Sequence, residues 1–189
     1  MSADFAAART NMVESQVRTQ DVTDLAIQDA MRHVPREALC PPGKTWLAYS
    51  DAEIEYAPGR WMLKPRDIAK LLQNVRPRAG ERALAIAAPY AAAVMEAMGL
   101  TVTRLDEGDL KTVTGDYDLI VCEGAVDRAP AAWLSALAMG GRLGVVERRG
   151  PVGRAMLYLR SDEGIGSRAL FDSTPPVLAG FEPEERFSF

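Results

Sequence analysis

The second half of the chain alternates short apolar runs with helical stretches, and this pattern constrains the fold more than any other feature. The predicted strands are residues 83–87, 100–105, 118–122 and 142–147. The predicted helices are residues 90–98 and about 129–138. Strands that are apolar throughout and alternate with helices indicate a parallel sheet covered on both faces. We expect Gly140-Gly141 to end the last helix and to start the next strand.

The residues on either side of this core complete an α/β domain. Residues 154–160 and 167–172 flank a turn-forming segment, which predicts an antiparallel hairpin at the sheet edge. The segments expected before the sheet are helices at about 4–18, 23–34 and 66–74 and an irregular stretch at 41–59. We expect residues 180–189 to pack as an edge strand, or to form an exposed aromatic tail that recruits a partner. No linker interrupts the chain, so residues 1–189 are interpreted as one domain.

Composition argues against several classes of function. The 189 residues carry a net charge of −4, which argues against nucleic-acid binding. No apolar run approaches the roughly 20 residues needed to cross a bilayer. The N-terminus lacks the charged-then-apolar order of a secretory signal. We therefore expect a cytoplasmic protein that does not bind nucleic acid or membranes.

The chain offers few residues for metal or nucleophilic chemistry. Cys40 and Cys122 lie far apart without metal-type spacing. Cys122 falls inside an apolar strand, where a buried and inert thiol is expected. His33 is the single histidine and lies at a helix end, so no Ser-His or Cys-His pair is predicted. We predict no metal site.

Several short motifs follow one another in a fixed order along the chain. They are Met-Val-Glu-Ser-Gln-Val-Arg at 12–18, Val-Thr-Asp at 22–24, Ala-Met-Arg-His-Val-Pro-Arg-Glu at 30–37, Tyr-Ser-Asp at 49–51, Asp-Tyr-Asp-Leu-Ile-Val at 116–121, Gly-Ala-Val at 124–126 and Gly-Gly-Arg-Leu at 140–143. Together they resemble the protein-L-isoaspartate O-methyltransferase family over nearly the whole chain. The resemblance implies a Rossmann-like methyltransferase sheet, with residues 1–78 as a helical cap and former substrate segment and residues 79–189 as the core.

The resemblance also implies a reaction. Family members transfer a methyl group from S-adenosylmethionine to the α-carboxylate of L-isoaspartyl residues in damaged proteins, and the ester then collapses to a succinimide. A carboxylate is already a nucleophile and the sulfonium is an activated donor, so the enzyme mainly places the two partners and excludes water. Loss of a binding surface should therefore matter more than loss of any single proton-transfer residue.

The first departure from the family lies at the loop that would hold the cofactor. The family has a glycine-rich turn that ends in Gly-Tyr, whereas this chain has Ala87-Ala88-Pro89-Tyr90. Alanine disfavours positive φ, and Pro89 has no N–H to donate. Tyr90 keeps its place, but the cradle for the amino-acid end of the cofactor is predicted to be lost.

The second departure is a deletion. Family members fit a helix and a strand between the second strand and Asp118, whereas only residues 106–117 are available here. That length can cross the sheet but cannot also hold a strand. We predict that the third strand and its preceding helix are missing. Asp106 ends the second strand, where this fold uses an acid for the ribose hydroxyls, although a solvated loop residue is the alternative.

The third departure lies in the substrate segment. By alignment on Pro65, the family's Thr-Ile-Ser falls on Trp61, Met62 and Leu63. Leu63 takes the serine position and its side chain cannot donate a hydrogen bond, so we assign no catalytic residue. Arg60 either pairs with a carboxylate or is an ordinary surface arginine. The run from Trp61 to Leu63 is interpreted as a hydrophobic plug of a former groove.

Two residues after the fourth strand, Glu123 and Gly124, complete the candidate cofactor site. Glu123 is expected either to face that site or to cap the following loop. Three functions stay open: a methyltransferase with weakened activity on isoaspartyl proteins, a non-catalytic relative that binds an unknown protein partner, and a small-ligand sensor. The three departures together predict that binding of S-adenosylmethionine is weakened or lost.

Overall fold

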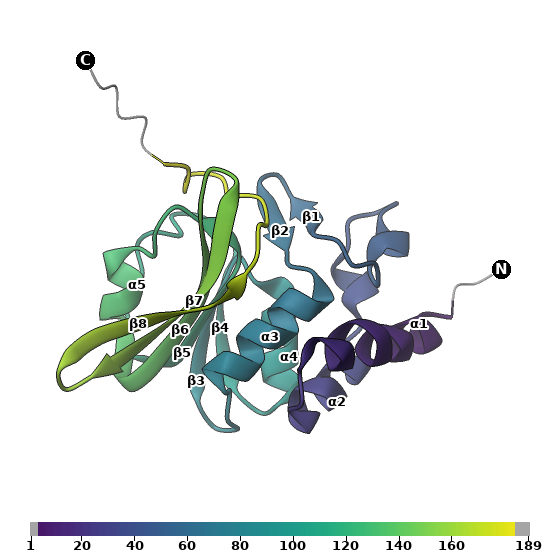
Figure 1. The fold of residues 1–189 in the computed structure, drawn as a ribbon, viewed down its shortest axis with the longest axis horizontal. Helices are drawn as coiled ribbons and strands as arrows, with labels where there is room; N and C mark the ends of the chain where they lie inside the picture. The colour runs from purple at the N-terminus through teal and green to yellow at the C-terminus, as the bar shows by residue number, and fades with distance from the viewer. Residues whose placement is uncertain (1–3, 184–189) are drawn as a thin grey trace, which may run out of the picture.

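A six-stranded sheet forms the centre of the computed structural model, which describes residues 4–183 (Figure 1). The strands are β3 (Arg82–Ile86), β4 (Thr101–Leu105), β5 (Tyr117–Val126), β6 (Leu137–Arg149), β7 (Val152–Ser161) and β8 (Gly164–Asp172). Their order in the sheet is β4-β3-β5-β6-β7-β8. The first three pairs are parallel, and β6–β7 and β7–β8 are antiparallel. The predicted parallel sheet with a C-terminal antiparallel hairpin is confirmed.

The connection between β4 and β5 is short. Residues 106–116 contain no strand or helix, so β4 is the edge strand on this side of the sheet within the described chain. The prediction of a missing third strand and preceding helix is confirmed. Because β3 lies between β4 and β5, the carboxyl ends of these three strands meet at one edge, where open α/β sheets bind their ligands.

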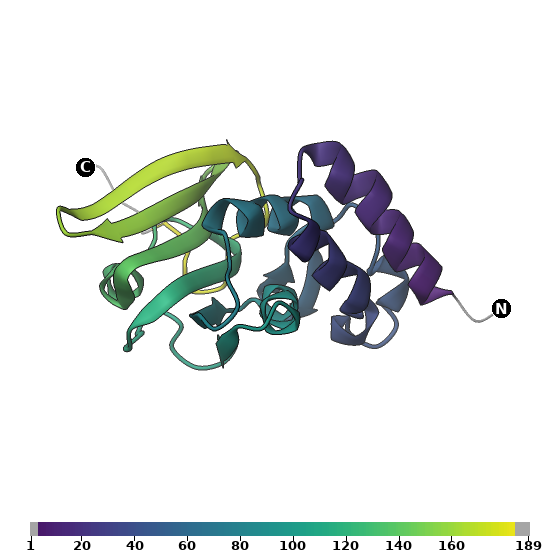
Figure 2. The same cartoon turned by 90° about the horizontal axis from the view of Figure 1, so that it is seen from below.

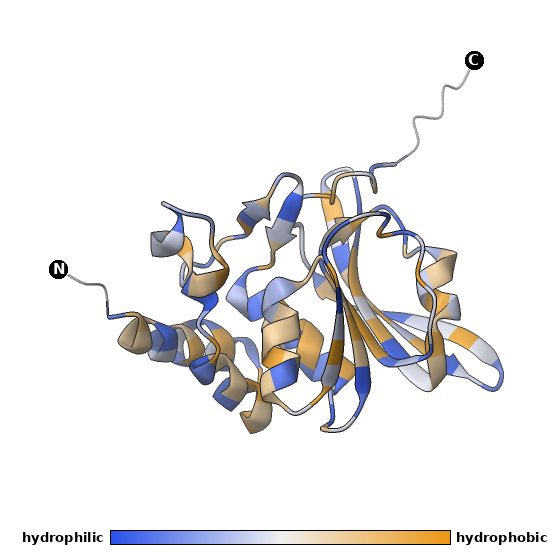
Figure 3. Ribbon diagram, turned by 180° about the vertical axis from the view of Figure 1, so that it is seen from behind, coloured by the Kyte–Doolittle hydropathy of each residue, from blue (hydrophilic) through white to orange (hydrophobic). Residues whose placement is uncertain are grey.

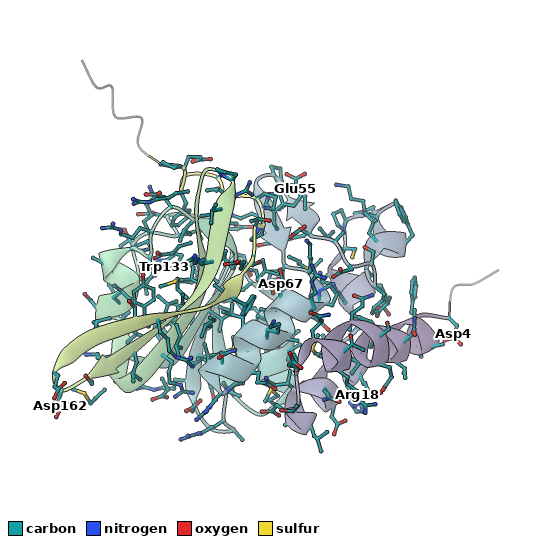
Figure 4. All side chains as sticks on the ribbon, in the orientation of Figure 1. Asp4, Arg18, Glu55, Asp67, Trp133 and Asp162 are labelled. Carbon is teal, nitrogen blue, oxygen red and sulfur yellow. The ribbon has the colours of Figure 1, made fainter. Side chains whose placement is uncertain are left out.

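Helices cover both faces of the sheet, and the side chains of β3 alternate between the two hydrophobic cores on these faces. Ala83 and Ala85 face the core shared with α3 (Pro65–Val75) and α4 (Pro89–Ala97). Leu84 and Ile86 face a second core, which includes Trp133 of the short helix α5 (Ala131–Ser135). Figure 4 labels Trp133 on the α5 side and Asp67 on α3.

The N-terminal helices form an outer layer. Helices α1 (Phe5–Met12) and α2 (Leu25–His33) lie beyond α3 and α4 rather than on the sheet, as Figures 1 and 2 show. A π-helical turn (Val13–Val17) and a 3₁₀ turn (Arg18–Gln20) continue α1. Helix α2 begins after Asp24, whose carboxylate accepts hydrogen bonds from two backbone N–H groups of the first turn. Figure 3 shows the apolar residues concentrated on the strands and on the helices that face them.

The prediction of a helix at 129–138 is wrong at the C-terminal end of that helix. Helix α5 ends at Ser135, and β6 already begins at Leu137, so Gly140-Gly141 lies inside a strand. The pairing of β5 with β6 shifts register at this point, and Gly140 has a φ of +77°. A Cβ on Gly141 would lie 2.8 Å from the backbone oxygen of Tyr117. The glycine pair therefore forms an irregularity within the strand instead of a helix end.

The segment expected to be irregular contains a short hairpin. Strands β1 (Ile54–Ala57) and β2 (Arg60–Met62) pair antiparallel around Gly59, whose φ is +65°. The two further 3₁₀ turns before it are Arg36–Leu39 and Thr45–Leu47. A Cβ on Gly59 would lie 2.6 Å from Cβ of Ala179, so the C-terminal segment packs directly on this turn.

The C-terminal residues do not add an edge strand where they can be described. Residues 180–183 are outside any strand, and residues 184–189 lie outside the described part of the chain. Instead, Val177 makes one parallel bridge to Ala125 at the end of β5. Between residues 4 and 183, no helix has the length and apolarity that a membrane span requires.

Candidate functional site

Most backbone N–H groups of the bend between β3 and α4 face acceptors within the protein. Ala87 has a left-handed backbone with φ +45°, and its N–H donates to the carbonyl of Leu105 at 2.9 Å. The N–H of Ala88 faces the carboxylate of Asp106. Pro89 has no N–H, and it starts α4 at the first helical position. Both alanines are fully buried, so the bend forms without glycine and presents few free donors to a ligand.

Glu123 lies at the centre of the candidate site. Its side chain is fully buried, and its Oε1 accepts a hydrogen bond of 2.6 Å from the backbone N–H of Ala91. Its Oε2 accepts a second one, of 2.9 Å, from the N–H of Leu63. Ala91 is the third residue of α4, so the carboxylate caps the helix N-terminus from the neighbouring strand. These two hydrogen bonds run to α4 and to the residue after β2, and neither runs to the loop that follows β5.

Burial governs the protonation of this acid. Desolvation raises the pKa of Glu123 to about 7, although the Arg36 guanidinium and the two backbone N–H groups oppose the shift. The cause is the transfer of a carboxylate from water into a buried site, which disfavours its charged form.

Arg36 supplies the nearby positive charge. Its side chain is fully buried, and its guanidinium lies 4.6 Å from the ring centroid of Tyr90. Nη2 donates to the carbonyl of Leu63 at 2.6 Å, while Nε and Nη1 have no hydrogen-bond partner. Arg36 was expected only as part of the Val-Pro-Arg-Glu motif, and its position beside Glu123 was not predicted.

Residues 60–63 fill the space beside this cluster. Met62 and Leu63 are fully buried in the core that contains Tyr90. Trp61 is half-buried and packs against the second core. Arg60 lies at the turn of the β1–β2 hairpin and donates to the carbonyl of Ala179 at 3.2 Å. Leu63 therefore meets Glu123 and Arg36 through its backbone, while its side chain fills the core.

Asp106 lies at the carboxyl end of β4, on the rim of the site. It is half-buried, and its Oδ1 has no hydrogen-bond partner. Burial raises the pKa of Asp106, against the opposing effects of Arg104 and the Ala88 N–H. Tyr56 of β1 has a similarly buried and unpartnered hydroxyl. Like Nε and Nη1 of Arg36 and the hydroxyl of Tyr90, these two groups are buried polar atoms without a hydrogen-bond partner.

The C-terminal segment covers Gly124. Gly124 has a φ of +91°, and a Cβ there would lie 2.5 Å from Cδ2 of Leu178. The N–H of Ala125 donates to Pro176 at 3.0 Å, and the N–H of Leu178 donates back to Ala125 at 2.8 Å. The segment 176–181 is thus a strap that closes the carboxyl end of β5.

Arg60 is also exposed to a surface groove of about 250 Å³. The other lining residues are Gly108, Asp109, Leu110, Lys111, Ala179, Gly180 and Phe181. The groove touches none of the other predicted site residues. In residues 4–183, no group of three or more His, Cys, Asp or Glu side chains is placed to hold a metal ion.

Comparison with known proteins identifies the relatives of this chain. No family model matches it. The protein-L-isoaspartate O-methyltransferase of Methylorubrum populi is 31% identical over 205 residues, covering 92% of this chain and 96% of the relative. Protein-L-isoaspartate O-methyltransferase 1 of Rhodopseudomonas palustris strain HaA2 is 31% identical over 168 residues, which is 74% of this chain and 69% of that protein. The Methylorubrum extorquens protein is 38% identical over 105 residues, and the match spans only 46% of its length.

Two solved structures share the fold. One is a protein-L-isoaspartate O-methyltransferase with a TM-score of 0.75 and 20% identity, covering 92% of this chain and 67% of that one. Another is a putative protein-L-isoaspartate O-methyltransferase from Plasmodium falciparum in complex with S-adenosyl-L-homocysteine, with a TM-score of 0.72, 15% identity and coverage of 90% and 97%. The fold is that of the Rossmann-like methyltransferases. The relatives at 31% identity place this chain in the protein-L-isoaspartate O-methyltransferase family.

Proposed function

We propose that this chain is a non-catalytic member of its family, which keeps the methyltransferase fold to bind or regulate a protein partner. The observation that carries the proposal is the 2.6 Å hydrogen bond from the N–H of Ala91 to Glu123. A helix N-terminus at the end of the first parallel strand is where this fold would receive the amino-acid end of S-adenosylmethionine. Here that position already holds a carboxylate of the protein.

The surrounding residues do not fit the cofactor. A zwitterionic amino-acid group needs several free donors and room to approach the backbone. The N–H of Ala87 donates a hydrogen bond to the carbonyl of Leu105, and the N–H of Ala91 donates one to Glu123. Pro89 has no backbone N–H. The fully buried Ala88 and Tyr90 leave no exposed surface at the bend. Binding would require Glu123 to leave and its space to be rebuilt.

The side that would receive the substrate supports the same proposal. Leu63 stands where the family resemblance implies a serine, and its N–H and carbonyl are bonded to Glu123 and Arg36. An isoaspartyl carboxylate would find no free backbone group on this residue. Burying it there without donors is unfavourable by several kcal/mol.

A weakened methyltransferase is the second candidate, and one observation favours it. Asp106 keeps a buried, unpartnered Oδ1 at the carboxyl end of β4, where an acid in this fold can bind ribose hydroxyls. In that case the substrate would be an isoaspartyl-containing protein, as in the family reaction.

A turnover assay separates the two candidates. Purified protein is incubated with isotopically labelled S-adenosylmethionine and an isoaspartyl peptide, beside an active family member under identical conditions. The non-catalytic proposal predicts no methyl ester above the level of a reaction without protein. Ester formation that depends on the protein and is lost in Asp106→Ala would establish the weakened enzyme instead.

A further inference from the structure

The Glu123 carboxylate is held by backbone groups and not by an ion pair. Its two oxygens accept hydrogen bonds from Ala91 at 2.6 Å and from Leu63 at 2.9 Å. Among the described residues it makes no ion pair. Convergent backbone N–H groups are a common way to recognise a ligand anion, because they carry fixed dipoles and no counter-charge of their own.

Other contacts fix both donors in place, independently of Glu123. Ala91 belongs to the nine-residue helix α4, whose start is set by Pro89. Leu63 is held by its buried side chain and by the 2.6 Å hydrogen bond that its carbonyl accepts from Arg36. Removing the Glu123 side chain would therefore leave two aligned donors around an empty space.

A buried cation completes the arrangement. Arg36 is fully buried beside Tyr90, and its Nε and Nη1 have no partner. Burying a guanidinium in the protein interior is unfavourable unless an anion lies close to it. The charge of Arg36 acts on Glu123 in addition to the α4 dipole.

We propose that Glu123 is an internal ligand, which occupies a binding site for a small monocarboxylate formed by the N–H groups of Ala91 and Leu63, beside the buried Arg36 guanidinium that holds the Leu63 carbonyl. A free monocarboxylate such as acetate binds there once the side chain is removed. The match in size is close, because Glu123→Ala removes two carbons and two oxygens, which is the heavy-atom content of acetate. This inference rests on the proposed closure of the cofactor site and names the group that closes it.

Chemical rescue tests the proposal. The thermal midpoint of Glu123→Ala is measured against acetate concentration, with sodium chloride at equal ionic strength and neutral acetamide as references. We expect the midpoint to rise with the logarithm of acetate concentration above its Kd, by about 4 °C when acetate exceeds its Kd tenfold. The wild-type midpoint should not respond, because its own carboxylate fills the site.

A second buried acid provides the matched control. Asp67 is 7% exposed, and its partners are side chains: the Ser173 hydroxyl donates to it at 2.7 Å, and Arg66 pairs with it at 3.5 Å. Asp67→Ala should be destabilised but insensitive to acetate. Equal rescue of both variants, equal rescue by chloride or acetamide, or no response of Glu123→Ala would overturn the proposal.

Refolding yield replaces the melting curve if Glu123→Ala does not stay folded. Recovery of soluble, helical protein with about 100 mM acetate but not with chloride supports the site, and equal or absent recovery refutes it. These results are distinct from the test of function. Methyl transfer by the wild type would refute the non-catalytic proposal, whereas failed rescue would refute only the internal ligand.

Discussion

The backbone N–H of Ala91 donates to the carboxylate of Glu123 at 2.6 Å, and this contact joins the start of α4 to β5. Parallel pairing places Ile86, the last residue of β3, opposite Cys122, so an acid at residue 123 reaches the helix that starts shortly after β3. The helix N-terminus is satisfied inside the protein. The fold of the family is kept, and on the proposed function Glu123 takes the position that would receive the amino-acid end of the cofactor.

Stability should depend on pH through Glu123. Burial raises its pKa from an ordinary value of 4.5 to about 7, so between these values the folded state holds a proton that the unfolded state has lost. The contribution to stability is fully present below pH 4.5 and is lost as pH rises through 7. It amounts to about 3 kcal/mol. Denaturant unfolding from pH 4.5 to 8 should show this fall relative to Glu123→Gln, and parallel pH profiles would contradict it.

Arg36 and Glu123 should be energetically coupled. Arg36→Met leaves the Leu63 carbonyl without its donor and the carboxylate without its nearby cation, and we expect a loss of about 3 kcal/mol at pH 8. Combining it with Glu123→Gln should be less destabilising than the sum by about 1–2 kcal/mol. The coupling should shrink at pH 5, where Glu123 is protonated. Additive losses at pH 8 would show that the two groups do not interact.

The C-terminal strap should contribute strongly to stability. Leu178 is fully buried over Gly124, so Leu178→Ala should lower the free energy of unfolding by about 3 kcal/mol through lost burial and a residual cavity. Ile165 is 42% exposed on β8, and Ile165→Ala should change stability by less than about 0.5 kcal/mol. Chemical denaturation of the two variants measures the difference. Equal effects would mean that the strap is not part of the cooperative core.

Rebuilding the glycine turn alone should not restore methyl transfer. Replacing Ala87, Ala88 and Pro89 with glycine returns flexibility and one N–H, but Glu123 still occupies the helix N-terminus and Leu63 still fills the substrate side. The variant, checked for folding by circular dichroism, should methylate no isoaspartyl peptide above background. Turnover from this change alone would show that the bend was the decisive loss.

The sheet could be predicted because its signals are local. Continuous apolar strands separated by helix-length segments fix a parallel arrangement, and the short stretch between Leu105 and Tyr117 leaves no room for a third strand. The β1–β2 hairpin was missed because its strands are short and its Pro58-Gly59 turn suggested irregular structure. Gly140 and Gly141 were predicted to end a helix because glycine is favoured both at helix ends and at irregularities within strands.

The candidate site was predictable in part. Glu123 could be selected because residues at the carboxyl ends of parallel strands converge. Its partners could not, because Arg36 and Leu63 reach it through the packing of the N-terminal cap, which no short-range pattern encodes. The strap over Gly124 depends in the same way on a long-range contact with Leu178.

The decisive measurement is a calorimetric titration of the wild-type protein with S-adenosylmethionine. Because Glu123 accepts hydrogen bonds from the N–H groups of Ala91 and Leu63, we expect no saturable heat at micromolar cofactor, while an active family member titrated in parallel gives a complete isotherm. Stoichiometric micromolar binding by the wild type would show that the cofactor site is open.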